Sequence, residues 1–369
     1  MSPELVIILV GSLVAGSCAL VGSFLVLRRM ALLGDAISHA VLPGIVLAFL
    51  ATGERSTLPM VIGAAAFGVI TVVLVELLQK TERLKEDASI GVVFPVLFSI
   101  GVLLLARYAN QVDLDLDCVL YGEIAYAPWD VLVLGGRTLG PKALWINGGV
   151  FLVNLLLVVL LYKELKLSTF DRELAATLGF APAALHYGLM AATSWTVVGA
   201  FESVGAILVV AMLVVPPAAA YLLTERLSRM LALSVGFGVA SAALGYLLAR
   251  AWDASIAGAM GVVAGLIFLA SFLLSPRHGL LAGTLRHARL ARATREQLVL
   301  LHLADHGLGV SLPDLAQRFG WSPRRLGRAV EALAERGFAD LTADRLTLTR
   351  EGSRALEESG QGPLRHRVG

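Results

Sequence analysis

The sequence predicts an all-α polytopic membrane protein followed by a small α+β domain, and three observations support this prediction. Of the 369 residues, 57% are hydrophobic and only 16% are charged, whereas soluble domains carry about 25% charged residues. Apolar segments of about 20 residues, the length that spans a bilayer as a helix, recur as far as residue 275. Beyond Pro276 these segments cease, and the composition becomes that of a basic soluble domain.

Nine apolar segments can be drawn, and each is near the length of a transmembrane helix. They cover residues 4–27, 31–52, 57–79, 88–107, 145–162, 184–201, 203–223, 230–250 and 256–275. We therefore expect about nine transmembrane helices. The two segments that meet at Glu202 could instead form one broken element, which would leave eight. Within the second of them, Pro216 and Pro217 predict a kink.

Lys and Arg residues predict the orientation, because they concentrate in cytoplasmic loops. The cation-rich ends contain Arg28/Arg29, Lys80/Arg83/Lys85, Lys163/Lys166/Arg172, Arg226/Arg229 and Arg277. This assignment puts the N-terminus outside the cell membrane and the C-terminal domain in the cytoplasm, which requires an odd number of spans. At one of these ends Glu76 precedes Lys80 by four residues, and we expect the two to form a surface ion pair.

Asp35 and His39 are the only ionisable residues in segment 31–52. A helix brings residues four apart onto one face, and a rise of about 1.5 Å per residue from Arg29 puts His39 near the bilayer midplane. There a carboxylate and an imidazole require a partner, water or a metal ion. From the spacing alone, two interpretations stay open. The pair packs a helix interface, or it binds a divalent cation, with a symmetric dimer supplying two copies of each residue.

The stretch from Arg28 to Gly44 resembles the signature of the ABC-importer permeases for manganese, zinc and iron. Three more stretches resemble the family in the same order: LKEDASIGVVFPVLFSIGVLLL, TFDRELAATLGF and VGAILVVAMLVVPPAAA. The resemblance covers residues 1–278. It implies that Asp35 and His39 lie on the translocation path and bind the transported metal. It also implies a second permease copy or a similar permease, and an extracytoplasmic metal-binding protein facing the acidic stretch 108–144.

Residues 163–183 predict a short amphipathic helix between two spans, with Thr169 or Asp171 as N-cap, Gly179 at its end and Pro182 blocking its continuation. Its apolar face could lie on the membrane surface. The resemblance favours the groove of a separate ATP-binding subunit, contacted by the positions that match the family's coupling segment: Phe170, Asp171, Glu173, Ala176 and Gly179. Because the chain has no GxxxxGK[ST] motif, we expect it to be a transport subunit and not an enzyme. We expect no covalent cofactor, only a transported metal.

The C-terminal residues from Arg277 contain 15 Arg and no Lys, with a net charge of +5. We expect a basic linker at 277–293, suited to anionic membrane lipid, a winged helix-turn-helix domain at 294–358, and a flexible tail at 359–369. The domain is predicted as three helices, two short strands and a closing helix. Its third helix carries three arginines on its exposed side, where they would contact nucleic acid: Arg324, Arg325 and Arg328.

This C-terminal domain resembles the DNA-binding domain of iron- and manganese-dependent repressors, without the metal-sensing half. DNA binding and protein interaction beside the ATPase both stay open. The predicted function is the permease subunit of an ABC importer for a divalent transition metal. Manganese is the first choice of transported metal, because a carboxylate is a hard ligand and the C-terminal domain resembles iron- and manganese-dependent repressors. Zinc or iron are the alternatives. Two rival functions are a membrane-tethered metal-responsive transcription regulator and a secondary transporter without an ATPase.

Overall fold

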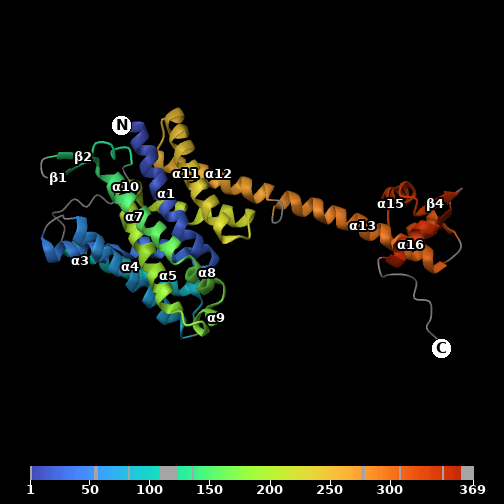
Figure 1. Ribbon diagram of the computed structural model, residues 1–369, viewed down its shortest axis with the longest axis horizontal. Coiled ribbons are helices and arrows are strands. Elements are labelled where there is room, and N and C mark those ends of the chain that lie inside the picture. The colour runs from blue at the N-terminus through green and yellow to red at the C-terminus, as the bar shows by residue number, and fades with distance from the viewer. Residues whose placement is uncertain are drawn as a thin grey trace. The chain divides into compact units, whose positions relative to one another are not determined.

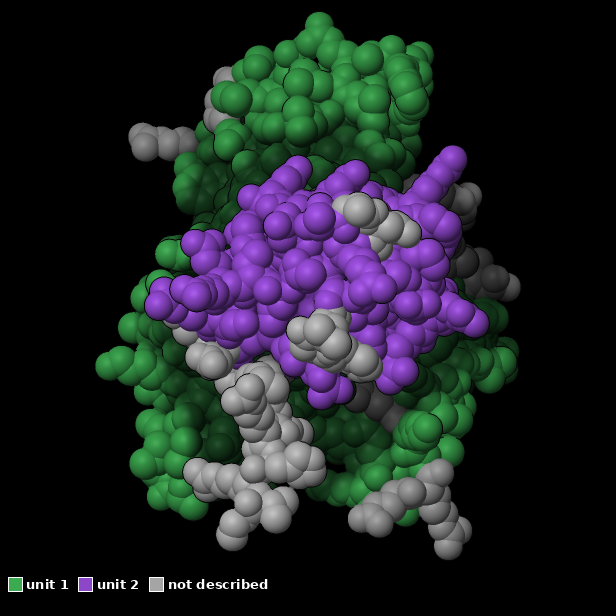
Figure 2. Space-filling view, turned by 90° about the vertical axis from the view of Figure 1, so that its right-hand side faces the viewer, with its two compact units in different colours: residues 1–279 green, residues 280–369 purple. Residues whose placement is uncertain are grey.

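Residues 2–53, 57–81, 84–108, 124–134, 137–275, 279–306, 309–342 and 345–358 are described by a computed structural model. The chain forms two units, residues 1–279 and residues 280–369, which are coloured separately in Figure 2. Each unit has its own hydrophobic core.

Unit 1 is a bundle of apolar helices. Its longer helices are α1 (Pro3–Leu27), α2 (Ala31–Ala40), α3 (Leu42–Thr52), α4 (Thr57–Gln79), α5 (Glu86–Tyr108), α7 (Lys142–Leu160), α10 (Pro182–Leu223), α11 (Leu227–Trp252) and α12 (Ile256–Leu274). Within the described ranges, eight helices are long and apolar enough to cross a membrane, with α2 and α3 counted as one. In Figure 1, α1 lies among α7, α10 and α11, and it packs against all three. Helices α2 to α5 form a second group, joined to the first chiefly by α10.

The predicted count of nine exceeds these eight because segments 184–201 and 203–223 both belong to α10. The first of these segments contains buried polar residues, including His186, Thr193, Ser194 and Thr196, and is therefore less apolar than the other spans. The helix breaks at Gly205, whose φ of 77° and ψ of 162° would strain any residue with a side chain. Within α10 only Gly205 departs from helical angles. The kink at Pro216 and Pro217 stays a prediction, because proline removes a helical hydrogen bond without leaving helical angles.

Polar side chains inside the bundle bond to one another across helices. The Asn154 amide donates to the Thr196 hydroxyl at 2.6 Å, and the Asn147 amide donates to the Ser203 hydroxyl at 2.8 Å. All four side chains are buried. Such bonds satisfy polar groups that hydrocarbon could not solvate, and they fix the rotation of α7 against α10.

The stretch expected as an external loop, residues 108–144, contains a small hairpin. Its strands β1 (Val131–Leu134) and β2 (Arg137–Pro141) pair antiparallel. The exposed rings of Tyr126 and Trp129 precede the hairpin, and such rings are typical of a membrane interface. Most of the acidic residues of this stretch, Asp113, Asp115, Asp117 and Glu123, lie outside the described residues.

Among the described residues of unit 2, four helices accompany a three-stranded antiparallel sheet. Its elements are α13 (Leu280–His306), β3 (Val310–Ser311), α14 (Leu312–Phe319), α15 (Pro323–Glu335), β4 (Ala339–Thr342), β5 (Arg345–Leu348) and α16 (Arg350–Glu358), and the strand order is β3-β5-β4. The core includes the fully buried Leu315 and Leu333. The segment predicted as a linker, 277–293, is helical from Leu280 and continuous with the helix expected from residue 294. The predicted tail, 359–369, lies outside the described residues.

Candidate metal site and coupling segment

The two predicted metal ligands lie on α2, a short helix bounded by a break at each end. At its start, Arg29 takes a left-handed φ of 63°, and the Met30 amide donates to the carbonyl of Leu25. At its end, Pro43 stands in the first turn of α3. Proline has no N–H, so the carbonyl of His39, four residues earlier, lacks its usual helical donor.

Asp35 and His39 lie on the outward face of α2. His39 Nε2 is 3.6 Å from Asp35 Oδ1. The His39 side chain is 35% exposed and the Asp35 side chain is 45% exposed. The opposite face of α2 is buried through Leu33, Ile37 and their neighbours. The separation exceeds the 2.7–3.2 Å of an ordinary hydrogen bond, so the pair leaves ligand atoms available for a cation.

Helix α5 forms a wall beside this pair. The rings of Phe94 and Phe98 lie 5.8 and 6.2 Å from the His39 ring, measured between centroids. The close packing depends on Gly101, where a Cβ atom would meet the backbone nitrogen of Pro43 at 2.8 Å. A side chain at this position would push α5 away from the junction of α2 and α3.

One subunit supplies few ligands at this depth. In the part of the chain that the structure describes, no three His, Cys, Asp or Glu side chains gather in an arrangement that would hold a metal. A divalent transition metal prefers four to six ligands. The half-exposed pair therefore supplies two ligand side chains, fewer than such a metal ion prefers.

The predicted coupling segment forms two short helices, α8 (Tyr162–Phe170) and α9 (Arg172–Thr177). Of the two candidate caps, Asp171 is the N-cap of α9, and its carboxylate accepts the Leu174 N–H at 2.9 Å. Gly179 follows with a φ of 85°. Pro182 does more than block continuation, because it occupies the first turn of α10.

The apolar face of this segment is exposed, with Phe170 at 61%, Leu174 at 46% and Leu178 at 61%. The five predicted coupling residues are all exposed: Phe170, Asp171, Glu173, Ala176 and Gly179. The segment thus presents an apolar patch with adjacent charges.

An ionic network that sequence reasoning missed joins this segment to the start of α2. The Arg28 guanidinium donates to the Ser168 hydroxyl at 3.0 Å and to the Thr169 hydroxyl at 3.1 Å, and its Nη1 lies 3.2 Å from His186 Nδ1. The pKa of Arg28 is lowered to about 10, mainly by burial and then by the nearby charge of Arg172. The guanidinium therefore keeps its charge at neutral pH.

The same network corrects the expected pair between Glu76 and Lys80. One Glu76 oxygen lies 2.5 Å from His186 Nε2, and the other accepts the Tyr187 hydroxyl at 2.6 Å. These side chains border a cavity of about 560 Å³, whose lining also includes Gln79, Lys80 and Arg172. The sequence carried one signal for the network, a histidine inside the apolar segment 184–201.

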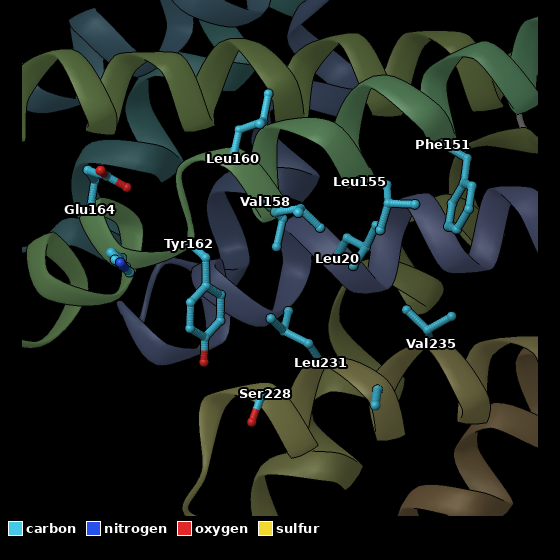
Figure 3. A pocket seen from close by; sticks show the side chains of 13 residues that line it. Leu20, Phe151, Leu155, Val158, Leu160, Tyr162, Glu164, Ser228, Leu231 and Val235 are labelled. Atoms are coloured by element: carbon cyan, nitrogen blue, oxygen red, sulfur yellow. The ribbon is translucent and has the colours of Figure 1, made fainter.

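A second cavity, of about 730 Å³, lies elsewhere in the bundle (Figure 3). Apolar side chains of α1, α7 and α11 line most of it, among them Leu20, Leu155 and Leu231. It contains neither Asp35 nor His39, and its lining includes a single carboxylate, that of Glu164. We assign no part of metal transport to it.

The three predicted nucleic-acid contacts lie on α15 of unit 2. Arg324, Arg325 and Arg328 are exposed, while Leu326 and Val330 of the same helix are buried in the core of the unit. The Arg328 side chain bonds back to the Arg324 carbonyl at 3.2 Å. The helix therefore presents a basic outer face.

Comparison with known proteins identifies relatives that match the chain over most of their own length. The sequence pattern of the ABC 3 transport family matches residues 5–275. The manganese transport system membrane protein MntD of Bacillus subtilis is 49% identical over 286 residues, which cover 78% of this chain and 97% of that protein. The zinc transport system membrane protein TroD of Treponema pallidum is 43% identical over 356 residues, 94% of this chain and 96% of that protein. This second match reaches into residues 280–369.

Among solved structures, PsaBC from Streptococcus pneumoniae in complex with Fab resembles the chain with a TM-score of 0.63 and 31% identity. The match covers 75% of this chain and 94% of the chain in that structure.

Proposed function

The chain belongs to the ABC 3 transport family, and we propose that it carries a divalent transition metal, manganese in the first place, across the cell membrane. It is a multi-pass membrane permease subunit of an ABC metal importer and a transport component, not an enzyme. Such a permease works with an ATP-binding subunit and a substrate-binding protein. The metal is the cargo of this subunit, and the proposal requires no covalent cofactor.

The observation that carries the proposal is the half-exposed pair of Asp35 and His39 on the outward face of α2. A carboxylate and an imidazole facing lipid would be costly. A second permease with the same face toward the first would remove both from lipid and supply two more ligands on the dimer axis. We propose a homodimer, or a pair with a similar permease. The solved structure that resembles this chain is named PsaBC, a name that joins two components, and this favours a permease that works as one of a pair.

Manganese is proposed ahead of zinc on chemical grounds. Carboxylate oxygen is a hard ligand, which suits Mn²⁺, and imidazole binds both ions. MntD is named as a manganese transport protein, whereas TroD is named as a zinc transport protein. Zinc is therefore the alternative cargo, and iron follows it.

ATP-driven alternating access would be transmitted through the exposed segment formed by α8 and α9. Its apolar patch and its capping carboxylate at Asp171 are suited to a groove in the ATP-binding subunit, and we propose that Phe170 is the central contact. Under this proposal the segment lies in the cytoplasm. Because α10 breaks at Gly205, we propose that its two halves cross the membrane separately, which keeps the number of crossings odd and puts unit 2 in the cytoplasm as well. The stretch 108–144 then faces the extracytoplasmic metal-binding protein.

We propose that unit 2 is a winged-helix domain, in which α14 and α15 form the helix-turn-helix and β4 and β5 form the wing. The strand order and the exposed arginines of α15 support this assignment. Its proposed ligand is DNA, contacted by Arg324, Arg325 and Arg328. The competing role is protein interaction beside the ATP-binding subunit.

Uptake by the complete transporter tests the proposed cargo. The permease and its ATP-binding subunit would be reconstituted in vesicles with the cognate binding protein, and uptake of Mn²⁺, Zn²⁺ and Fe²⁺ would be measured with and without ATP. We expect ATP-dependent uptake of Mn²⁺, with Zn²⁺ as the weaker substrate. Uptake that needs no ATP would contradict an ABC importer, and preferred uptake of Zn²⁺ would reverse the order of the metals.

A further inference from the structure

The side chain of Arg28 bridges two parts of the bundle that the proposed function requires to move together. Its guanidinium bonds the hydroxyls of Ser168 and Thr169, which are in the last turn of α8. Its backbone belongs to the short link between α1 and α2. Ser168 is 1% exposed, so the contact is shielded from water, where charge-assisted hydrogen bonds are strong.

The backbone around Arg28 is suited to transmit displacement. Only Arg28, Arg29 and Met30 separate α1 from α2, and the amides of all three bond to carbonyls in the last turn of α1. Arg29 holds a left-handed conformation that costs a side-chain-bearing residue energy. The Arg28 side chain therefore lies directly before the start of α2, and Asp35 lies just over one turn further along.

A second arm of the network anchors Arg28 to two other helices. Its Nη1 faces His186 Nδ1 near the start of α10, and His186 Nε2 faces the Glu76 carboxylate on α4. With Nδ1 accepting from the guanidinium, the imidazole proton is on Nε2, the nitrogen that lies 2.5 Å from a Glu76 carboxylate oxygen. The Tyr187 hydroxyl occupies the other Glu76 oxygen. The arrangement leaves Arg28 a defined position between α8 and α10.

We propose that Arg28 is a positioning residue that couples the ATPase-facing segment α8–α9 to the metal-bearing helix α2. This inference rests on the proposed function of α8–α9 as the contact for the ATP-binding subunit. Arg28 itself does not touch the metal. When the ATP-binding subunits displace α8, the guanidinium transfers that displacement to the link before α2 and changes the access to Asp35 and His39.

The test follows the response of α2 to nucleotide, independently of which cargo is carried. Leu32 is 54% exposed and lies one turn before Asp35. A Leu32→Cys substitution, in a background where Cys18 and Cys118 are replaced by Ala, gives a probe on α2. Its labelling rate by a maleimide would be measured in the complete reconstituted transporter, without nucleotide and with ATP trapped by vanadate.

We expect nucleotide to change the labelling rate by about tenfold, within the usual range of coupling between sites. We expect Arg28→Gln to abolish this change while metal binding at Asp35 and His39 and ATP hydrolysis stay within about twofold of the parent. Arg28→Lys keeps one charge but not the three-way fork, and it should restore only part of the response. Arg229→Gln, an exposed cation at the start of α11, is the matched control and should respond like the parent.

A double variant, Ser168→Ala with Thr169→Val, removes the two acceptors without touching the guanidinium. It should reduce the response by itself and cause no further loss when combined with Arg28→Gln, because the same contact is already absent. A normal nucleotide response in Arg28→Gln, losses that simply add, or loss of metal binding in Arg28→Gln would each overturn the proposal. If the response depends on Arg28 but no metal is taken up by the parent, the coupling stands and the proposed cargo fails.

Discussion

His39 Nε2 and Asp35 Oδ1 lie 3.6 Å apart on the outward face of α2. This short helix ends at Ala40, just before a junction that contains Pro43. The two groups are close enough to bind one ion together and too far apart to satisfy each other by an ordinary hydrogen bond. Their half exposure makes the pair dependent on something outside its own subunit.

Gly101 is predicted to be required for the metal site, because α5 approaches the backbone at Pro43 there. Gly101→Val would put a Cβ atom 2.8 Å from the Pro43 nitrogen, and such overpacking costs about 1–3 kcal/mol. We expect a lower melting temperature and weaker metal binding. The matched control is Gly91→Val on the same helix, where the added Cβ would meet no atom of another element within 4 Å. Equal effects of the two substitutions would show that the close approach is unimportant.

Asp35 and His39 were predicted from the sequence because two ionisable residues at helical spacing in an apolar segment are conspicuous. The break of α10 was not predicted, because Gly205 is one of 37 glycines and nothing local marks its positive φ. The contacts of Arg28 were also missed. They join residues more than 130 positions apart, and a cation at the end of a span already has a sufficient explanation in the positive-inside rule.

Some ends of helices were predictable because their signals are local in the sequence. Asp171 and Gly320 act through local backbone chemistry that the sequence displays, as an N-cap and as a left-handed residue after α14. Whether Glu76 would pair with Lys80 or with His186 depended on packing between α4 and α10. Local spacing favoured the wrong partner.

Phe170 is predicted to contribute to assembly with the ATP-binding subunit and little to the stability of the permease. Its side chain is 61% exposed, and a central aromatic contact in an interface contributes about 2 kcal/mol or more. Phe170→Ala should therefore weaken binding of the ATP-binding subunit by at least about 30-fold. Co-purification at a series of concentrations measures the affinity, and thermal unfolding of the permease alone measures stability. Trp252→Ala, another exposed aromatic, is the control and should leave the affinity unchanged.

We predict that unit 2 can unfold without unfolding unit 1 and without stopping metal transport. Leu315 is fully buried in its core, and Leu→Ala at such a site costs about 2–5 kcal/mol. In the full chain, Leu315→Ala should make residues 280–369 sensitive to limited proteolysis while residues 1–279 stay resistant and ATP-dependent metal uptake continues. Exposed Leu341→Ala is the control and should leave the cleavage pattern unchanged. If metal uptake were lost when unit 2 unfolds, transport would depend on unit 2, which would contradict the prediction.

The basic face of α15 is predicted to bind DNA through Arg324, Arg325 and Arg328. A gel-shift assay with residues 280–369 should detect a complex that weakens as salt rises, because phosphate contacts release counterions. Replacing all three arginines with Ala should abolish it, and replacing the exposed Arg350 and Arg354 of α16 should reduce it only slightly. Equal loss in both variants would indicate a general charge effect, and the absence of any complex would favour protein interaction instead.

Metal binding by the purified permease tests the central claim most directly. Titration calorimetry would compare the wild type with Asp35→Asn and His39→Gln, using Mn²⁺ and Zn²⁺, and with Asp253→Asn as a matched carboxylate control far along the chain. We expect one metal ion per two subunits. Each site variant should lose affinity by more than about 100-fold, since even the outer-shell partners of a metal contribute 10–100-fold, and the control should bind normally. Unchanged affinity in both site variants would mean that Asp35 and His39 only pack a helix interface, and the account of transport through them would be wrong.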